Sequence, residues 1–93
     1  MKLTFLGTGT SHGVPVIGCK CGVCTSDNPK NKRNRCSLWV EDQGLSIIID
    51  TATEFRLQAI AYGVTRVDAI LFTHNHADHV MGLDDIRPFN ERQ

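Results

Sequence analysis

The sequence has no long apolar run, no excess of one charge and few aromatic side chains. Its 93 residues include ten basic and ten acidic side chains, and aromatic residues make up 6%. A balanced charge gives no electrostatic indication of a nucleic acid or an anionic membrane as partner. The apolar stretch at the N-terminus is far too short for a signal peptide or a membrane span. These absences argue against a membrane protein and predict a cytoplasmic one.

The length limits the chain to one small domain, and the composition argues against disorder. Apolar residues make up 41%, which is ordinary for a globular protein. The four cysteines of a cytosolic chain are expected to be free thiols or metal ligands rather than disulfides.

Hydrophobic patterns predict a mixed α/β architecture. Polar and apolar residues alternate over residues 2–6, as in a half-buried strand. Two further strands, over 37–41 and 45–49, flank a short hairpin turn. A helix that stops at Gly63 follows, and the apolar run 69–72 then predicts a strand buried on both faces. Strand, helix and strand in this order make a parallel βαβ unit.

The boundaries of the two predicted helices rest on local signals. Thr51 with Glu54 three residues later fits a capping box at the start of the first helix, and Thr53 is the alternative cap. The second helix is predicted to run from near His79 to just before Pro88.

A dense group of metal-binding side chains follows the last predicted strand. His74, His76, Asp78 and His79 lie within six residues, so three of the four histidines in the chain fall there. Because alternate side chains of extended backbone point the same way, His74 and His76 can face one ion. Asp78 and His79 can face a second ion where the chain turns into the next helix. Imidazole and carboxylate suit zinc, manganese or iron, so a metal centre is favoured over a solvated polar turn.

Asp50 ends the strand that is predicted to lie beside the strand before His74. Sites in parallel sheets form beyond the carboxyl ends of the strands, so both residues should emerge at the same edge. A carboxylate at that position can hold a ligand imidazole in one tautomer. Capping of the following helix is the alternative role, and the sequence favours the two equally.

Residues 18–36 are predicted to be irregular and contain a second candidate metal site. Cys19, Cys21 and Cys24 place three thiols within six residues. Three thiolates supply three of the four ligands of a tetrahedral zinc site. Cys36 is the remaining cysteine, but its place at the start of a strand favours a buried, inert thiol.

Two further segments are candidates for contact with an anionic substrate. The Gly-rich loop (residues 7–13) can hold phosphate oxygens through its backbone N–H groups. His12 in this loop either lines the mouth of the site or has no ligand role. Four basic side chains form a short run in a polar loop, where solvation is favoured over substrate contact. They are Lys30, Lys32, Arg33 and Arg35.

These motifs together resemble a known family. The string from His74 to His79, after an apolar strand and before Gly82-Leu83-Asp84, is similar to the HxHxDH motif of the metallo-β-lactamase superfamily. Within that superfamily, the Gly7-Thr8-Gly9-Thr10 start and the cysteine triplet resemble the phosphoribosyl cyclic phosphodiesterases of phosphonate breakdown. The resemblance covers nearly all 93 residues.

The resemblance implies an α/β fold that forms half of a larger domain. Residues 1–93 would be the N-terminal half of a four-layer αββα sandwich, with a zinc-binding loop at about 16–36. In the family, the remaining active-site ligands and the distal His of the structural zinc come from later segments. The rest of the fold would therefore come from further residues or another chain, and this chain is expected to be inactive alone.

The resemblance also implies cofactors and a reaction. His74 and His76 would bind one divalent ion, zinc or manganese, and Asp78 and His79 a second, while the cysteines bind a structural zinc. Asp78 would also orient the hydroxide that the two ions activate, which makes it the predicted catalytic residue. The substrate would be a small cyclic or ribosyl phosphodiester.

Two alternatives of a different kind stay open. A nuclease that resembles the transfer-RNA 3′-processing endonucleases would share the Gly-Thr-Gly start and the metal motif, and its partner would be RNA. The cysteine triplet favours the cyclic phosphodiesterases over this nuclease. The non-enzymatic alternative is a fragment that binds zinc without catalysis.

Overall fold

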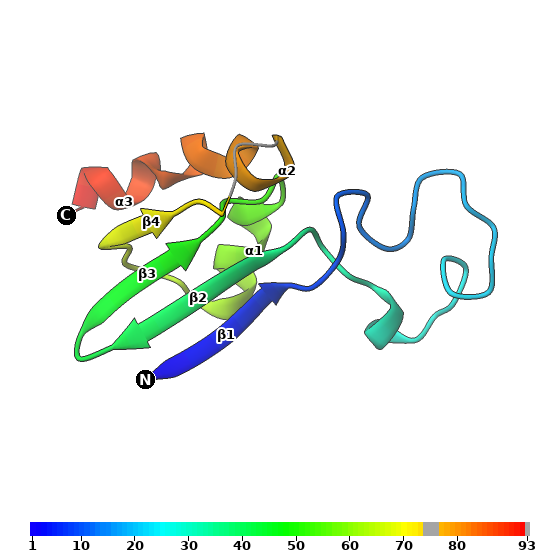
Figure 1. Cartoon of the computed structure of the whole chain (residues 1–93), viewed down its shortest axis with the longest axis horizontal. Coiled ribbons are helices and arrows are strands. Elements are labelled where there is room, and N and C mark those ends of the chain that lie inside the picture. Colours follow the sequence, from blue (N-terminus) through cyan, green and yellow to red (C-terminus); the bar gives the residue numbers. More distant parts are fainter. Residues whose placement is uncertain (74–76, 93) are drawn as a thin grey trace.

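The computed structural model describes residues 1–73 and 77–92, which form a four-stranded sheet and several short helices (Figure 1). The strand order is β1-β2-β3-β4, with β1–β2 and β2–β3 antiparallel and β3–β4 parallel. The predicted hairpin and parallel βαβ unit are therefore confirmed. In chain order the elements are β1 (Lys2–Gly7), the 3-10 helix η1 (Pro29–Asn31), β2 (Ser37–Asp42), β3 (Leu45–Ile49), α1 (Phe55–Tyr62), β4 (Ala69–Leu71), α2 (Ala77–Val80), the 3-10 helix η2 (Met81–Ile86) and α3 (Arg87–Arg92).

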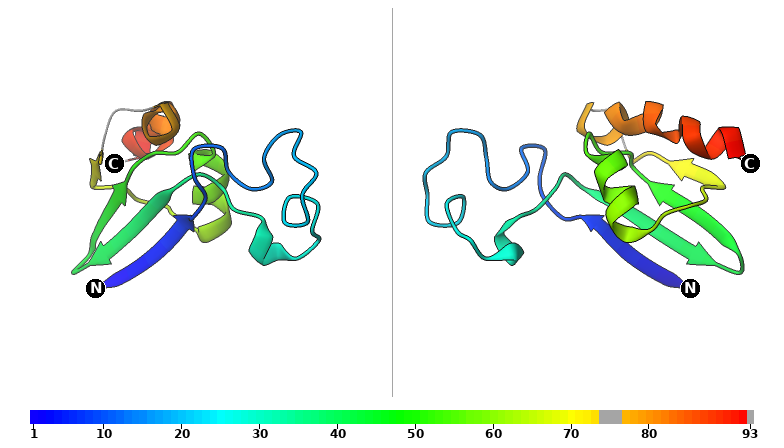
Figure 2. Two further views of the ribbon diagram at one scale, coloured as in Figure 1. Left: turned by 45° about the vertical axis from the view of Figure 1, so that its right-hand side comes forward. Right: turned by 180° about the vertical axis from the view of Figure 1, so that it is seen from behind.

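The hydrophobic core lies between one face of the sheet and the helices. Alternation along the strands turns Leu6 and Ile48 toward this face, where both are buried, and Trp39 packs against them. Phe55 of α1 and Phe89 of α3 meet in the core with ring centroids 6.4 Å apart. Figure 2 shows α1 lying across this face of the sheet.

The opposite face of the sheet, called the open sheet face below, is apolar and largely exposed. The strand register places nine apolar side chains on it, and Phe5 is 63% and Leu71 56% exposed. In the described part of the chain, the helices that contribute to the core all pack on the other face. The nine residues are Leu3, Phe5, Leu38, Val40, Leu45, Ile47, Ile49, Ala69 and Leu71.

The prediction that residues 69–72 are buried on both faces is wrong for this structure. β4 is an edge strand, and Ala69, Leu71 and Phe72 are exposed, while Ile70 faces the core and is partly buried. A continuous apolar run marks a strand that is covered on both faces. The described residues cover only one of them.

The end of α1 is predicted correctly and its start is not. Gly63 adopts the left-handed conformation with a φ of 74°, and its N–H donates to the carbonyls of Ala59 and Ile60. Neither threonine caps the helix, because the N-cap is Glu54, whose side chain makes no cap hydrogen bond. That carboxylate instead forms an ion pair with Arg35.

The second helical region is longer than predicted. It begins at Ala77 and continues through η2 and α3 to Arg92, past the expected stop before Pro88. Pro88 is the second residue of α3, and a first helical turn tolerates proline because its N–H groups have no partner within the helix. None of the helices in the described residues is long and apolar enough to cross a membrane.

Candidate metal sites

The carboxyl ends of β1, β3 and β4 lie at one end of the sheet, called the site end below. β1 runs parallel to β3 because both are antiparallel to β2, and β4 is parallel to β3. The Gly-rich loop follows β1, Asp50 follows β3, and Thr73 lies two residues beyond β4. Figure 1 shows the loop after β1 and the start of α2 at this same end.

The Asp50 carboxylate contacts both Thr73 and His79 at the site end. It is 2% exposed, and its left-handed backbone, with a φ of 65°, turns the chain sharply after β3. Oδ1 accepts a hydrogen bond of 2.8 Å from the Thr73 backbone N–H, and Oδ2 accepts one of 2.7 Å from the Thr73 hydroxyl. Oδ2 also lies 2.7 Å from Nδ1 of His79. Asp50 thus holds the His79 ring, one of its two predicted roles, and does not cap α1.

The contacts of Asp50 keep its carboxylate charged. Burial alone raises the pKa of Asp50, but the N–H and hydroxyl of Thr73 and the His79 ring outweigh burial and lower it below its usual range. A charged acceptor at 2.7 Å requires the proton on Nδ1 of His79. Metal binding by this ring would therefore use Nε2, as in other sites where a carboxylate orients a histidine ligand.

Backbone contacts fix the segment that carries His79 against the segment after Asp50. The Thr51 N–H donates to the His79 carbonyl at 2.8 Å, and the Gly82 N–H donates to the Thr51 carbonyl at 3.2 Å. A Cβ on Gly82 would lie 2.1 Å from the Ala52 carbonyl oxygen, so the two segments touch backbone to backbone. These contacts therefore fix the backbone of His79, from which its ring extends.

The other predicted ligands of the active site cannot be placed. His74 and His76 lie outside the described residues, and so does the side chain of Asp78. Their metal-binding roles stay predictions. Thr73 is the site residue that sequence reasoning missed, and the available signal was a hydroxyl side chain between the apolar strand and the first histidine.

The three predicted zinc-binding cysteines come together in the loop. The sulfurs of Cys19, Cys21 and Cys24 all lie within 4.8 Å of one another. Zn–S bonds of about 2.3 Å in tetrahedral geometry require sulfurs roughly 3.8 Å apart, so small shifts would suffice for a shared ion. The Val16 N–H donates to Cys24 Sγ and the Cys24 N–H to Cys21 Sγ, each at 3.4 Å. Such bonds stabilise thiolates.

The electrostatics of the cluster differ between its members. The backbone N–H of Cys24, followed by the neighbouring thiols, lowers the pKa of Cys21 to about 7. The Val16 N–H lowers the pKa of Cys24, but Cys19, burial and Cys21 together raise it above its ordinary value. None of the four cysteines, all of which lie in the described residues, forms a disulfide there.

Cys36 is not the buried thiol that was expected. It is exposed and lies outside the three-cysteine cluster. The reason is strand alternation, because Ser37 takes the inward position at the start of β2. Ser37 is 1% exposed, and its hydroxyl donates to the Asp50 carbonyl at 2.7 Å.

Two side chains of the basic run, Arg33 and Arg35, contact the Gly-rich loop, while Lys30 and Lys32 are exposed. Arg33 Nη1 donates to the Thr8 hydroxyl at 2.9 Å, and Arg35 Nε donates to the Ser11 carbonyl at 2.8 Å. The prediction of a solvated run is therefore wrong for Arg35, whose side chain is only 27% exposed. His12, in the same loop, is exposed.

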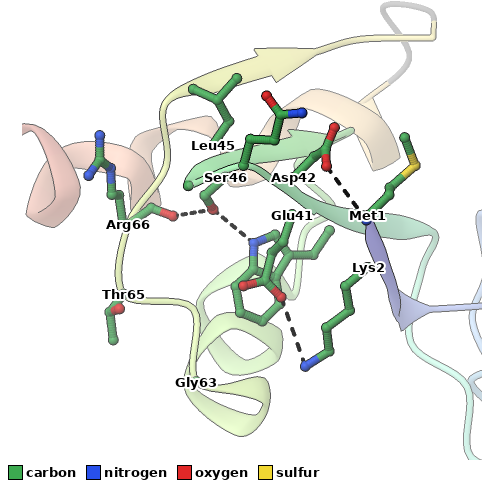
Figure 3. Close-up of a pocket in the computed structure, with 12 residues that line it drawn as sticks. Met1, Lys2, Glu41, Asp42, Leu45, Ser46, Gly63, Thr65 and Arg66 are labelled. Carbon is green, nitrogen blue, oxygen red and sulfur yellow. Dashed lines mark hydrogen bonds and ion pairs between the residues drawn. The ribbon is translucent and has the colours of Figure 1, made fainter.

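A cavity of about 520 Å³ lies at the opposite end of the sheet from Asp50 (Figure 3). Both signs of charge line it, and they pair with one another: the Met1 amine lies 3.5 Å from Asp42, and Lys2 lies 4.0 Å from Glu41. This cavity faces the amino ends of the parallel strands, whereas sites in such sheets form beyond the carboxyl ends.

Comparison with known proteins gives consistent matches. A model of the metallo-beta-lactamase superfamily matches residues 33–88. A solved structure described as a new diphosphatase from the PhnP family is 53% identical with a TM-score of 0.91, over 94% of this chain and 34% of that one. An octanoyltransferase from Porphyromonas gingivalis is 50% identical over 94% of this chain and 18% of its own length. Ribonuclease Z from Clostridium acetobutylicum is 43% identical over 73% of this chain and 21% of its own length.

The chain is much shorter than these relatives. It spans about a fifth of the two curated proteins and about a third of the solved structure. The mixed sheet with its βαβ unit agrees with that solved structure, so the predicted fold class is confirmed.

Proposed function

Because this chain belongs to the metallo-beta-lactamase superfamily, we propose that it forms part of a metal-dependent hydrolase that cleaves phosphodiester bonds. The proposal concerns the protein that contains these 93 residues together with the rest of the fold, called the full-length protein below. The matched segment is 34% of the solved structure and 18% of the octanoyltransferase, so the remaining ligands would come from residues beyond it or from another chain.

The observation that carries this proposal is the contact between the buried Asp50 carboxylate and the partly buried His79 ring at the site end. A charged carboxylate that fixes a histidine ring next to the carboxyl ends of parallel strands is the arrangement that supports a metal-ligating imidazole. His79 is itself the last residue of the predicted ligand string. The donor set of the site thus fits a divalent ion.

The ligands follow the sequence predictions. His74 and His76 would hold one ion, and Asp78 and His79 a second. When bound, two divalent ions supply an activated water and offset the charge that builds up on the phosphoryl oxygens. Asp50 keeps the proton of His79 on Nδ1, and Thr73 holds the Asp50 carboxylate in place with two hydrogen bonds. Asp78 is proposed to orient the attacking water.

The names of two of the three reported relatives support chemistry at phosphorus, and the third is an octanoyltransferase. One is a diphosphatase and one a ribonuclease, and both of these names describe attack on phosphorus. We favour a small cyclic or ribosyl phosphodiester, because the three-cysteine cluster accompanies the resemblance to the cyclic phosphodiesterases. The match to ribonuclease Z makes RNA the second candidate. Comparing turnover of a small phosphodiester with cleavage of a transfer-RNA precursor separates the two.

The experiment that tests the proposal is Asp78→Asn in the full-length protein. We expect turnover of bis-p-nitrophenyl phosphate to fall about 100-fold with little change in KM, because Asn keeps the shape but no longer orients the nucleophile. Turnover and metal content are measured at saturating manganese or zinc, so that occupancy is restored. Asp42→Asn, at the far end of the sheet, is the control and should match the wild type.

One outcome would contradict the proposed role of Asp78. If Asp78→Asn regains wild-type turnover once metal is saturating, the side chain only helps to retain the ion. A full-length protein that hydrolyses no phosphodiester with either metal would refute the proposed function itself.

We further propose that the three-cysteine cluster binds one structural zinc. Its sulfurs are close together and two of them accept backbone hydrogen bonds. Removal of the ion should loosen residues 16–36 without abolishing hydrolysis, because metal coordination orders short irregular segments. Native mass spectrometry with and without a thiol-reactive reagent tests this. A protein that never carries a cysteine-dependent zinc would rule it out.

The open sheet face supports a partner for this chain. Its nine apolar side chains match the surface that a second sheet covers in a sandwich. We propose that the rest of the full-length protein, or another chain, lies there. We also propose a cytoplasmic location for the protein.

A further inference from the structure

The Gly-rich loop presents polar groups at the site end of the sheet. It leaves β1 where Asp50 leaves β3, and Thr8, Thr10, Ser11 and His12 in it are exposed. Hydroxyl, imidazole and backbone amide groups of this kind suit the oxygens of a phosphodiester. The position of the loop relative to Asp50 would therefore affect how well such a substrate binds.

The base of the loop is held by the backbone of residues 33–35. The Gly9 N–H donates to the Asn34 carbonyl at 2.7 Å. A Cβ on Gly7 would lie 2.0 Å from the Arg35 carbonyl oxygen, so the backbone segments at residues 7 and 35 approach more closely than any side chain at position 7 would allow. These contacts fix the start of the loop but not its tip.

The side chain of Arg35 reaches the tip. Its Nε donates to the Ser11 carbonyl at 2.8 Å, and its Nη1 forms an ion pair with Glu54. Both charged side chains are mostly buried, with 27% and 23% exposure. The carbonyl of Arg35 also accepts a 2.9 Å hydrogen bond from Nε2 of Gln58, which is 1% exposed. Arg35 is thus anchored to α1 at two points while it holds the loop.

The Glu54 partner of Arg35 is close in sequence to Asp50, which contacts the candidate metal ligand His79. Glu54 is the N-cap of α1, four residues beyond Asp50, whose carboxylate holds the His79 ring. A guanidinium can serve Ser11 and Glu54 at once, because its N–H donors lie in one rigid plane. The ammonium group of a lysine is a single point, and it cannot reproduce both contacts in this geometry.

We propose that Arg35 is a positioning residue that sets the tip of the Gly-rich loop for binding a phosphodiester at the metal centre. This inference rests on the proposed function. It concerns binding and not the chemical step, because Arg35 acts through the Ser11 backbone rather than on the reacting atoms.

The test is Arg35→Lys in the full-length protein, with Arg66→Lys as a matched control. Arg66 likewise uses two guanidinium nitrogens, but its Nε and Nη2 both bind the Asp68 carboxylate, at the opposite end of the sheet. For Arg35→Lys we expect KM for bis-p-nitrophenyl phosphate to rise about tenfold with kcat within about twofold, which is the pattern of lost binding. Hydrogen exchange at residues 8–13 should become faster in this variant and stay unchanged in Arg66→Lys.

Three outcomes would overturn the inference in different ways. An unchanged KM in Arg35→Lys, with an active wild type, refutes the positioning role alone. A fall in kcat and thermal stability at constant KM would show that Arg35 only supports the fold. A wild-type protein without phosphodiesterase activity refutes the proposed function, and the positioning role with it.

Discussion

Replacing Asp50 with alanine is expected to lower the free energy of unfolding of the full-length protein by about 3–5 kcal/mol. The carboxylate is 2% exposed and accepts hydrogen bonds from the Thr73 N–H, the Thr73 hydroxyl and the His79 ring. Alanine removes this shared acceptor from the partly buried His79 ring and from the two Thr73 donors, and loss of a hydrogen bond to a charged group costs about 1.5–3 kcal/mol. Alanine also strains a position whose φ is 65°.

The measurement is urea unfolding in the presence of a chelator, so that metal loss does not contribute. Asp42→Ala, which removes an exposed carboxylate paired with the N-terminal amine, should cost no more than about 1 kcal/mol. Asp50→Asn should retain more stability than alanine but weaken metal binding about 10- to 100-fold, because it no longer fixes the tautomer of His79. An alanine variant as stable as the wild type would show that these hydrogen bonds contribute little.

The 93-residue chain alone is expected to hydrolyse no bis-p-nitrophenyl phosphate, while the full-length protein is active. Three imidazoles and one carboxylate cannot complete the coordination of two ions, and an incomplete site binds metal weakly. The open sheet face would also remain exposed, with Phe5 63% and Leu71 56% accessible.

Both proteins are assayed with added manganese or zinc, and their metal content is measured by atomic absorption. A full-length His74→Ala variant is the useful comparison, because it should lose the first ion while keeping the complete fold. Turnover by the short chain at the rate of the full-length protein would contradict the prediction, since the 93 residues would then contain a competent site.

Local signals in the sequence predicted the elements that local interactions decide. The alternation over residues 2–6 gave β1, and Gly63 gave the end of α1 through its left-handed conformation. The predicted N-cap of α1 was wrong, because a side chain caps a helix only if it has no better hydrogen-bond or ion-pair partner elsewhere. Glu54 pairs with Arg35, which lies 19 residues earlier in the chain, and no local pattern contains that contact.

The candidate site could be predicted in its residue types but not in its connections. The role of Asp50 stayed undecided because a carboxylate after a strand suits both a helix cap and a histidine partner. Its backbone conformation and its distance to His79 decided between them. The prediction that residues 69–72 are buried on both faces was wrong for a different reason. An apolar run indicates that both faces of the strand are packed against other residues. It does not indicate whether those residues belong to the same 93-residue segment.

The open sheet face has a consequence for biosynthesis. If later residues cover it, the first sheet emerges from the ribosome well before its cover, because translation adds only about 5–20 residues per second. During that interval β4, which ends at the exposed Leu71, would be an unprotected edge, and the next residue, Phe72, is exposed as well. Edges of this kind pair readily with other nascent chains. Early binding by a chaperone would therefore decide how many newly made molecules reach the folded state.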